Sequence, residues 1–279
     1  MVVLGVGIWF FPHPEAVTAQ AWHLFAIFIT AILAVIVNAL PILVAAILAL
    51  SLTVLTHTLE PDQAYAGFSE GFILLIVAAF MVARGVVNSG FGQRIALLLI
   101  SRFGQSTLRL GYCLAVADAI IAPAFPSNTA RSGVLFPIVY SLAESNGSHP
   151  WEASRKRLGA YLMMTSMAGL GLSSALWLTA MAANPVGAAL ARQQGVELTF
   201  VSWFVASSVP TITARVVIPW LLFKVFPPEH KQTPDAPAAA ATRLTQLGSM
   251  SSREWITLAT FAGMVGGWGL AETLALDPT

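Results

Sequence analysis

Charged residues are scarce in this sequence. Only 10% of the 279 residues are Asp, Glu, Lys or Arg, whereas an ordinary soluble domain has roughly 25%. Hydrophobic residues make up 57%, and the mean hydropathy is +0.76. This composition excludes a typical soluble domain and predicts an all-α polytopic membrane protein with the lipid bilayer as its surroundings. The formal net charge of +1 gives no reason to expect a nucleic-acid partner.

Cysteine and nucleotide-binding motifs are also nearly or wholly missing. Cys113 is the single cysteine, which excludes an internal disulfide and a CxxC redox or zinc site. No GxxxxGK[ST] phosphate loop occurs, which disfavours transport driven by ATP within this chain. The five histidines lie in loops or near the ends of apolar runs, so we expect no metal cluster and no cofactor.

Apolar runs in residues 1–90 predict membrane spans, which we group as a first domain. Residues 1–11 are too short for the roughly 20 residues that a bilayer requires. We therefore expect them to be the end of a longer span. The other runs cover residues 19–37, 42–55 and 71–87.

The distribution of basic residues predicts the orientation of the spans, because cytoplasmic loops are enriched in Lys and Arg. The loop at residues 56–70 has acidic residues and no basic ones, so we place it away from the cytoplasm. The basic residues that this topology places at cytoplasmic ends or loops are Arg84, Arg94, Arg102, Arg109, Arg155, Lys156, Arg157, Lys224, Lys231, Arg243 and Arg253.

The same pattern divides the rest of the chain. Both flanks of residues 108–145 are basic, and the two apolar arms of this segment are short. A re-entrant hairpin entered from the cytoplasm therefore fits better than two full crossings. The predicted segments are a cytoplasmic surface helix (91–107), a central element (108–226), a cytoplasmic linker (227–253) and one further span (254–279). The central element consists of the hairpin (108–145), a broken helix (158–195) and a return helix (200–226).

Two prolines and three small polar residues interrupt the hairpin at its centre, in the sequence APAFPSNTAR (122–131). Ser127, Asn128 and Thr129 offer oxygens that can coordinate a hard cation and hydrogens that can donate to a carboxylate. A helix starting there would direct unpaired N–H groups at the same point. The plainer interpretation is an ordinary N-cap. The prolines and the expected depth in the bilayer favour a binding site.

Arg131 is costly at that depth unless something pairs with it. Counting residues from the tip places Asp118 on the first arm at about the height of Arg131. The two could form a structural ion pair that holds the arms together. Alternatively, Arg131 could provide positive potential for a substrate carboxylate. Arg215, midway along the return helix, is either paired or directed to the headgroup region.

A second break lies at residues 178–185, where Pro185 follows Asn184. A residue before proline is biased away from helix, so we expect an unwound loop that faces the hairpin tip. The alternative is a simple proline kink. Small residues before the break, including Ser173 and Ser174, are expected to allow close helix packing.

The motif GFSEG (67–71) matches the GxSxG nucleophile elbow of hydrolases. That motif requires a strand-to-helix turn and a partner histidine, whereas here it opens a membrane span. A membrane-embedded hydrolase that uses Ser69 is therefore an unfavoured alternative. A non-transporting membrane assembly subunit is the other alternative.

Several motifs carry a family resemblance. AP (122–123), PSNTAR (126–131) and FP (136–137) resemble the first Ser-Asn-Thr signature of the divalent anion:sodium symporter (DASS) family. The pattern is most similar to the branch with citrate/succinate antiporters and 2-oxoglutarate/malate translocators. Further matches in the same order are QAWH (20–23), GQRIAL (92–97), LGY (110–112), residues 179–185 and SREW (252–255).

The resemblance implies half of an inverted-repeat, elevator-type carrier with one re-entrant hairpin and one broken helix in each half. Such a carrier would move small carboxylate anions of the succinate, malate, 2-oxoglutarate and citrate class, by anion exchange or by cation-coupled symport. A bacterial inner-membrane location and a homodimer of the full-length protein are expected. No second Ser-Asn-Thr follows in this sequence, so the resemblance covers an N-terminal half.

The resemblance also implies roles for individual residues. The substrate-binding residues would be Ser127, Asn128, Thr129 and Arg131. A coupling cation, with sodium as the candidate, would be bound by Pro123, Ser127, Asn128, Ala180 and Asn184. Catalytic residues are not expected, because the family transports rather than transforms its substrate.

Overall fold

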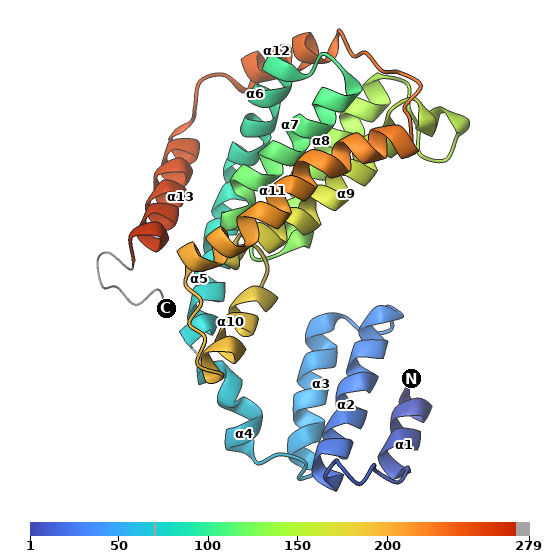
Figure 1. Ribbon diagram of the computed structural model, residues 1–279, viewed down its shortest axis with the longest axis vertical. Helices are drawn as coiled ribbons and strands as arrows, with labels where there is room; N and C mark the ends of the chain where they lie inside the picture. The colour runs from blue at the N-terminus through green and yellow to red at the C-terminus, as the bar shows by residue number, and fades with distance from the viewer. Residues whose placement is uncertain (70, 272–279) are drawn as a thin grey trace. The chain divides into compact units, whose positions relative to one another are not determined.

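The computed structural model describes residues 1–69 and 71–271, and in that part of the chain every regular element is a helix (Figure 1). The described residues form thirteen α-helices, which are joined by loops and four short 3-10 helices. The predicted all-α class is confirmed. The chain divides into two compact units, Met1–Ile73 and Leu74 onward, which we call the N-terminal and C-terminal units.

The N-terminal unit packs three apolar helices, α1 (Val2–Phe10), α2 (Ala19–Ile36) and α3 (Ile42–Leu55), followed by the short α4 (Pro61–Tyr65). Thr18 starts α2, because its hydroxyl accepts a hydrogen bond from the N–H of Ala21 at 3.2 Å. The indole of Trp22 joins α2 to α1 by donating to the carbonyl of Ile8 at 2.7 Å.

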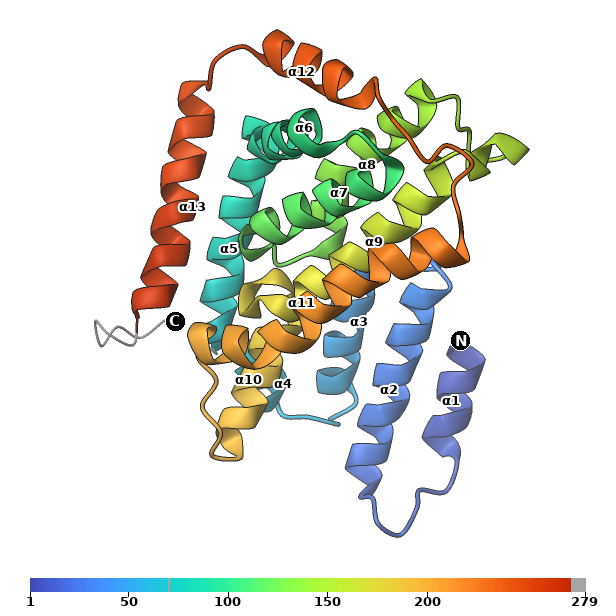
Figure 2. The same ribbon diagram turned by 45° about the horizontal axis from the view of Figure 1, so that its top comes forward.

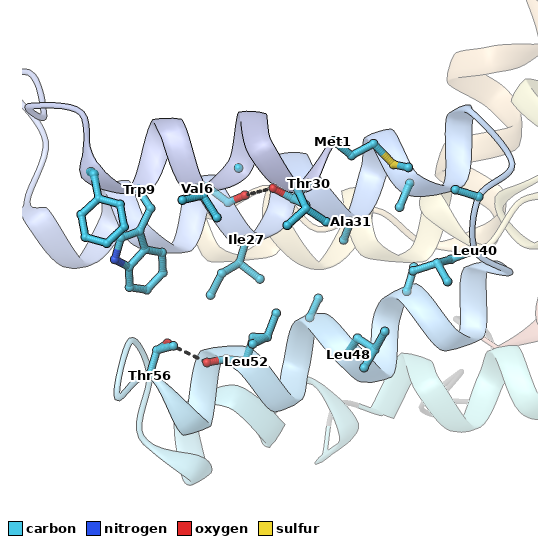
Figure 3. A pocket seen from close by; sticks show the side chains of 18 residues that line it. Met1, Val6, Trp9, Ile27, Thr30, Ala31, Leu40, Leu48, Leu52 and Thr56 are labelled. Carbon is cyan, nitrogen blue, oxygen red and sulfur yellow. Dashed lines mark hydrogen bonds between the residues drawn. The ribbon is translucent and has the colours of Figure 1, made fainter.

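An apolar groove of about 630 Å3 lies between α1, α2 and α3 (Figure 3). Its lining includes Trp9, Ile27, Leu48 and Leu52 and no charged side chain. Two threonines line it as well, but both hydroxyls donate to backbone carbonyls of their own helices. The groove therefore offers no charged side chain and no free hydroxyl donor to a charged small molecule.

Helix α5 (Gly71–Ser89) leads into the C-terminal unit. The remaining α-helices of this unit are α6 (Phe91–Phe103), α7 (Thr107–Ile121), α8 (Asn128–Ser145), α9 (Gly159–Leu176), α10 (Ala183–Gln193), α11 (Phe200–Val225), α12 (Ala236–Leu247) and α13 (Ser252–Leu270). Figures 1 and 2 both show α7, α8, α9 and α11 side by side, with α12 beside α6.

The core of this unit lies where α7, α8 and α9 meet. Leu114, Leu135 and Leu162, one from each helix, are at most 2% exposed. Gly111 of α7 permits a close approach, because an added Cβ would lie only 2.5 Å from the hydroxyl oxygen of Tyr161 on α9. The polar groups described below are fixed within this packed core.

Three described helical segments are long and apolar enough to cross a membrane: Ala19–Ile36, Thr107–Ala124 and Phe200–Val225. The chain is thus a multi-pass membrane protein. The segment 107–124 is α7 continued by a 3-10 turn, so it is longer than the short arm that we expected. The re-entrant course of the hairpin stays a prediction, as do the assigned domains.

The predicted linker at 227–253 contains a helix, α12. Its alanine-rich sequence has high helix propensity, and Ala236 and Ala240 are buried. Thr233 fixes the preceding loop by donating to the carbonyl of Gly104 at 2.8 Å. The segment 227–253 is therefore ordered against α6 and its C-terminal end, which composition alone did not indicate.

Candidate functional site

The tip of the hairpin is a compact turn. Helix α7 continues as a 3-10 turn over Ala122–Ala124, and Phe125 is fully buried. Ser127 is the N-cap of α8, and its hydroxyl accepts from the N–H of Ala130 at 3.4 Å. Ser127 therefore has the capping role of the plainer interpretation. Its neighbours decide what else the tip can bind.

Helix α8 begins at Asn128, so the backbone N–H groups of Asn128 and Thr129 precede the first intrahelical hydrogen bonds. Neither N–H has a partner in the described part of the chain, and Thr129 is exposed. The first turn of a helix carries partial positive charge. The tip thus presents backbone donors suited to an anion.

The amide of Asn128 has a defined orientation. Its Oδ1 accepts from Nη2 of Arg131 at 2.8 Å and from the hydroxyl of Ser174. A guanidinium has only donors, so the amide atom that faces Arg131 must be the oxygen. The Nδ2 group has no partner among the described residues. Asn128 can therefore offer two further N–H donors beside its backbone N–H.

Arg131 is completely buried and lies between α7, α8 and α9. Its Nε is 2.8 Å from Oδ1 of Asp118, so the two side chains form an ion pair. The geometry of these two atoms does not meet the criteria for a hydrogen bond. Its Nη2 also donates to the carbonyl of Leu170 and the hydroxyl of Ser174, at 2.7 and 2.8 Å. The two groups that residue counting placed at one height are thus in contact.

Asp118 has a second partner that sequence reasoning missed. The hydroxyl of Ser173 donates to its Oδ2, and Nη2 of Arg215 donates to Ser173 Oγ at 2.5 Å. Ser173 and Ser174, expected only to allow close packing, are both polar links in this network. Two adjacent serines before a helix break were the available signal. Arg215 is buried and hydrogen-bonded, not directed to headgroups.

The second break has a different form from the one expected. Helix α9 ends at Leu176, and Asn184 lies in the first turn of α10, not in an unwound loop. Pro185 is tolerated there because the first helical turn needs no intrahelical N–H. The Asn184 amide donates to the carbonyls of Ser174 and Trp177 at 2.7 and 3.1 Å. It thus satisfies carbonyls left open at the end of α9.

The hairpin tip and the break lie against each other. The hydroxyl of Thr179 donates to the carbonyl of Pro123 at 2.8 Å, and the N–H of Ala182 donates to the carbonyl of Pro126 at 2.9 Å. Ala180, within the break, is fully buried. These bonds join the two interrupted elements into one polar centre.

The oxygens at this centre fit a cation poorly at Asn128. A cation on Oδ1 would approach the Arg131 guanidinium, whose Nη2 is 2.8 Å away, and like charges at such distances repel. The oxygens of Ser127 and Pro123 already accept hydrogen bonds. The free donors of Asn128 and Thr129 instead suit a carboxylate. Arg131 is the cationic side chain in contact with Asn128 in this arrangement.

A family model and several known proteins match this chain. The family model described as sodium:sulfate symporter transmembrane region matches residues 1–279. YflS of Bacillus subtilis is 41% identical over 280 residues, covering 100% of this chain and 59% of that protein. Chloroplastic dicarboxylate transporter 2 of Spinacia oleracea is 41% identical over 269 residues, covering 95% and 48%. The inner membrane protein YbhI of Escherichia coli is 34% identical over 278 residues, covering 97% and 58%.

The chain thus spans about half to three fifths of the length of these relatives. The resemblance drawn from the Ser-Asn-Thr motif is confirmed, and the hydrolase alternative at Ser69 is not supported, because the family consists of transporters. The chain belongs to the sodium:sulfate symporter, or DASS, transmembrane family, a family of transporters and not of enzymes.

Proposed function

We propose that this chain forms half of a carrier that moves dicarboxylate or tricarboxylate anions of the succinate, malate, 2-oxoglutarate and citrate class across a membrane. The observation that carries the proposal is the set of unpaired donors on Asn128 and Thr129 beside the buried Arg131. Carboxylates are bound by such donors at helix starts. The spinach relative named as a dicarboxylate transporter supports this substrate class.

In this proposal the substrate carboxylate lies at the start of α8 and is bound by Ser127, Asn128 and Thr129. The fixed charge of Arg131 and its hydrogen bond to Asn128 favour anion exchange without a cation at Asn128. If a sodium ion couples transport, it must use oxygens other than Asn128 Oδ1, such as carbonyls near Pro123, Ala180 and Asn184.

We further propose the architecture that the family resemblance implied. Residues 1–90 serve as a scaffold that dimerises, and residues 108–226 form a transport element that slides against it. Residues 91–107 and 227–253 lie on the cytoplasmic side of a bacterial inner membrane. The E. coli relative named as an inner membrane protein supports this location.

Counterflow in liposomes tests the function. The protein encoded by the complete open reading frame that includes this chain is purified and reconstituted. Uptake of labelled succinate, malate, 2-oxoglutarate and citrate is then measured with and without sodium. We expect saturable uptake driven by internal dicarboxylate that does not require sodium. Absence of uptake of every carboxylate would contradict the proposal and favour the assembly-subunit alternative.

Replacing Asn128 by alanine tests the site in the same assay. Removing its two free donors is expected to lower kcat/KM at least about tenfold, since hydrogen bonds to a charged group contribute about 1.5–3 kcal/mol. Asn146→Ala is the matched control, because Asn146 caps the opposite end of α8 and donates to its own helix. Equal uptake by the two variants would contradict the assignment of Asn128.

A further inference from the structure

The buried charges of the C-terminal unit do not balance. Among the described residues, the buried charged side chains are Arg94, Asp118, Arg131, Arg215 and Glu254. Arg94 pairs with Glu254 at 2.5 Å. The other three are one carboxylate and two guanidiniums, and arginine does not lose its proton in proteins. With Asp118 ionised between them, this trio carries one excess positive charge.

The trio is connected to the tip of the hairpin by direct contacts. Arg215 on α11 donates to Ser173, Ser173 donates to Asp118, and Asp118 pairs with Arg131. Arg131 donates in turn to Asn128. A guanidinium on α11 is thus linked, through α9 and α7, to the first residue of α8.

Arg215 is also held in place by backbone groups. Its Nη1 donates to the carbonyl of Ala115 on α7, and its Nη2 lies 3.5 Å from the carbonyl of Gly169 on α9. The Nε atom of Arg215 is buried without a hydrogen-bond partner in the described part of the chain, and so is the Nη1 atom of Arg131. Carbonyl dipoles stabilise a guanidinium but do not cancel its charge. The excess positive charge of Asp118, Arg131 and Arg215 is therefore not neutralised by these carbonyl groups, and a bound anion could neutralise it.

We propose that Arg215 is a positioning residue that offsets the charge of Asp118, so that the charge of Arg131 remains available to a doubly charged anion at Asn128. Asp118 alone would neutralise Arg131 and leave the tip with only the partial charge of a helix start. This inference rests on the proposed function. It assigns to Arg215 a selectivity for dianions over monoanions, although Arg215 does not lie at the tip itself.

A purely structural clamp by Arg215 makes a different prediction. A clamp depends on the number of hydrogen bonds between α11, α9 and α7, so removing more of them only weakens it further. A charge balance depends on the difference between acidic and basic groups. Removing one acid together with one base would then restore the original excess.

The test compares Arg215→Gln, Arg215→Lys and the double variant Asp118→Asn/Arg215→Gln. Each is made in the protein encoded by the complete open reading frame and reconstituted in liposomes. Counterflow of labelled succinate, and its inhibition by succinate and by the monoanion propionate, are measured at neutral pH. We expect Arg215→Gln to raise the KM for succinate about tenfold or more and to leave inhibition by propionate less affected. The double variant is expected to recover most of the loss, and Arg215→Lys to lose less than Arg215→Gln.

Thermal unfolding in detergent with and without succinate separates folding from binding. If Arg215→Gln folds poorly, the charge-balanced double variant is expected to regain both its melting temperature and its stabilisation by succinate. An unchanged KM in Arg215→Gln, or a double variant worse than the single one, would overturn the inference while uptake by the unaltered protein still supports the carrier. No uptake by the unaltered protein would overturn the carrier and this inference together.

Discussion

Replacing Arg131 by methionine is expected to abolish carboxylate uptake and to destabilise the protein by about 3–5 kcal/mol, the usual cost of removing one partner of a buried ion pair. Arg131 is completely buried, and it contacts Asp118, Asn128, Leu170 and Ser174. Its loss would leave the Asp118 carboxylate with Ser173 as its direct partner, and would leave Asn128 Oδ1 with the Ser174 hydroxyl as its one described partner. Uptake in liposomes and thermal unfolding in detergent measure the two effects.

Arg192→Met is the matched control for this variant. Arg192 is exposed near the end of α10, so its replacement should change stability by less than about 0.5 kcal/mol. An Arg131→Met protein with normal stability and uptake would mean that the buried pair neither supports the fold nor serves the site. Normal stability without uptake would mean that Arg131 serves substrate binding and does not stabilise the fold.

Replacing Arg94 by methionine is expected to lower the free energy of unfolding by about 3–5 kcal/mol, because it leaves Glu254 buried without its charge partner. Nε and Nη2 of Arg94 bind the two oxygens of Glu254 at 2.5 and 3.1 Å, and Nη1 donates to the carbonyl of Gly248 at 3.0 Å. The fork fixes the start of α13 against α6. Unfolding of the purified variant measures the loss.

A double-mutant cycle distinguishes the ion pair from simple packing. If the cost of Arg94→Met comes from the unpaired carboxylate, Arg94→Met/Glu254→Leu should be more stable than Arg94→Met alone. Arg253→Met is the control for loss of a positive charge, because Arg253 is exposed and lies next to Glu254 in the sequence. Additive losses in the cycle would show that Arg94 and Glu254 act independently.

Local sequence patterns predicted the hairpin tip well. Two prolines and the Ser-Asn-Thr run placed the break in the chain, and the structure starts α8 at Asn128. Counting residues along two helical arms from a common tip was enough to bring Asp118 and Arg131 to the same height. Both inferences depend only on helical rise and on interactions between residues close in sequence.

Contacts between distant helices could not be predicted in this way. Ser173 and Arg215 reach Asp118 from α9 and α11, and no local pattern specifies which face of α11 packs against α9. Asn184 was misplaced because the rule for residues before proline competes with the tolerance of proline in a first helical turn. In this structure Asn184 is helical, and its side-chain amide donates hydrogen bonds to carbonyls at the end of α9.

The most direct measurement of the central claim, that the tip at Asn128 and Thr129 binds the transported carboxylate, is substrate protection of a cysteine at Thr129. Thr129 is exposed and the native Cys113 is buried, so a polar thiol reagent should modify Thr129→Cys selectively within this chain. We predict that succinate or malate slows the modification in a saturable way and that acetate does not. An equal rate of modification with and without dicarboxylate, in a protein that still transports it, would contradict the claim.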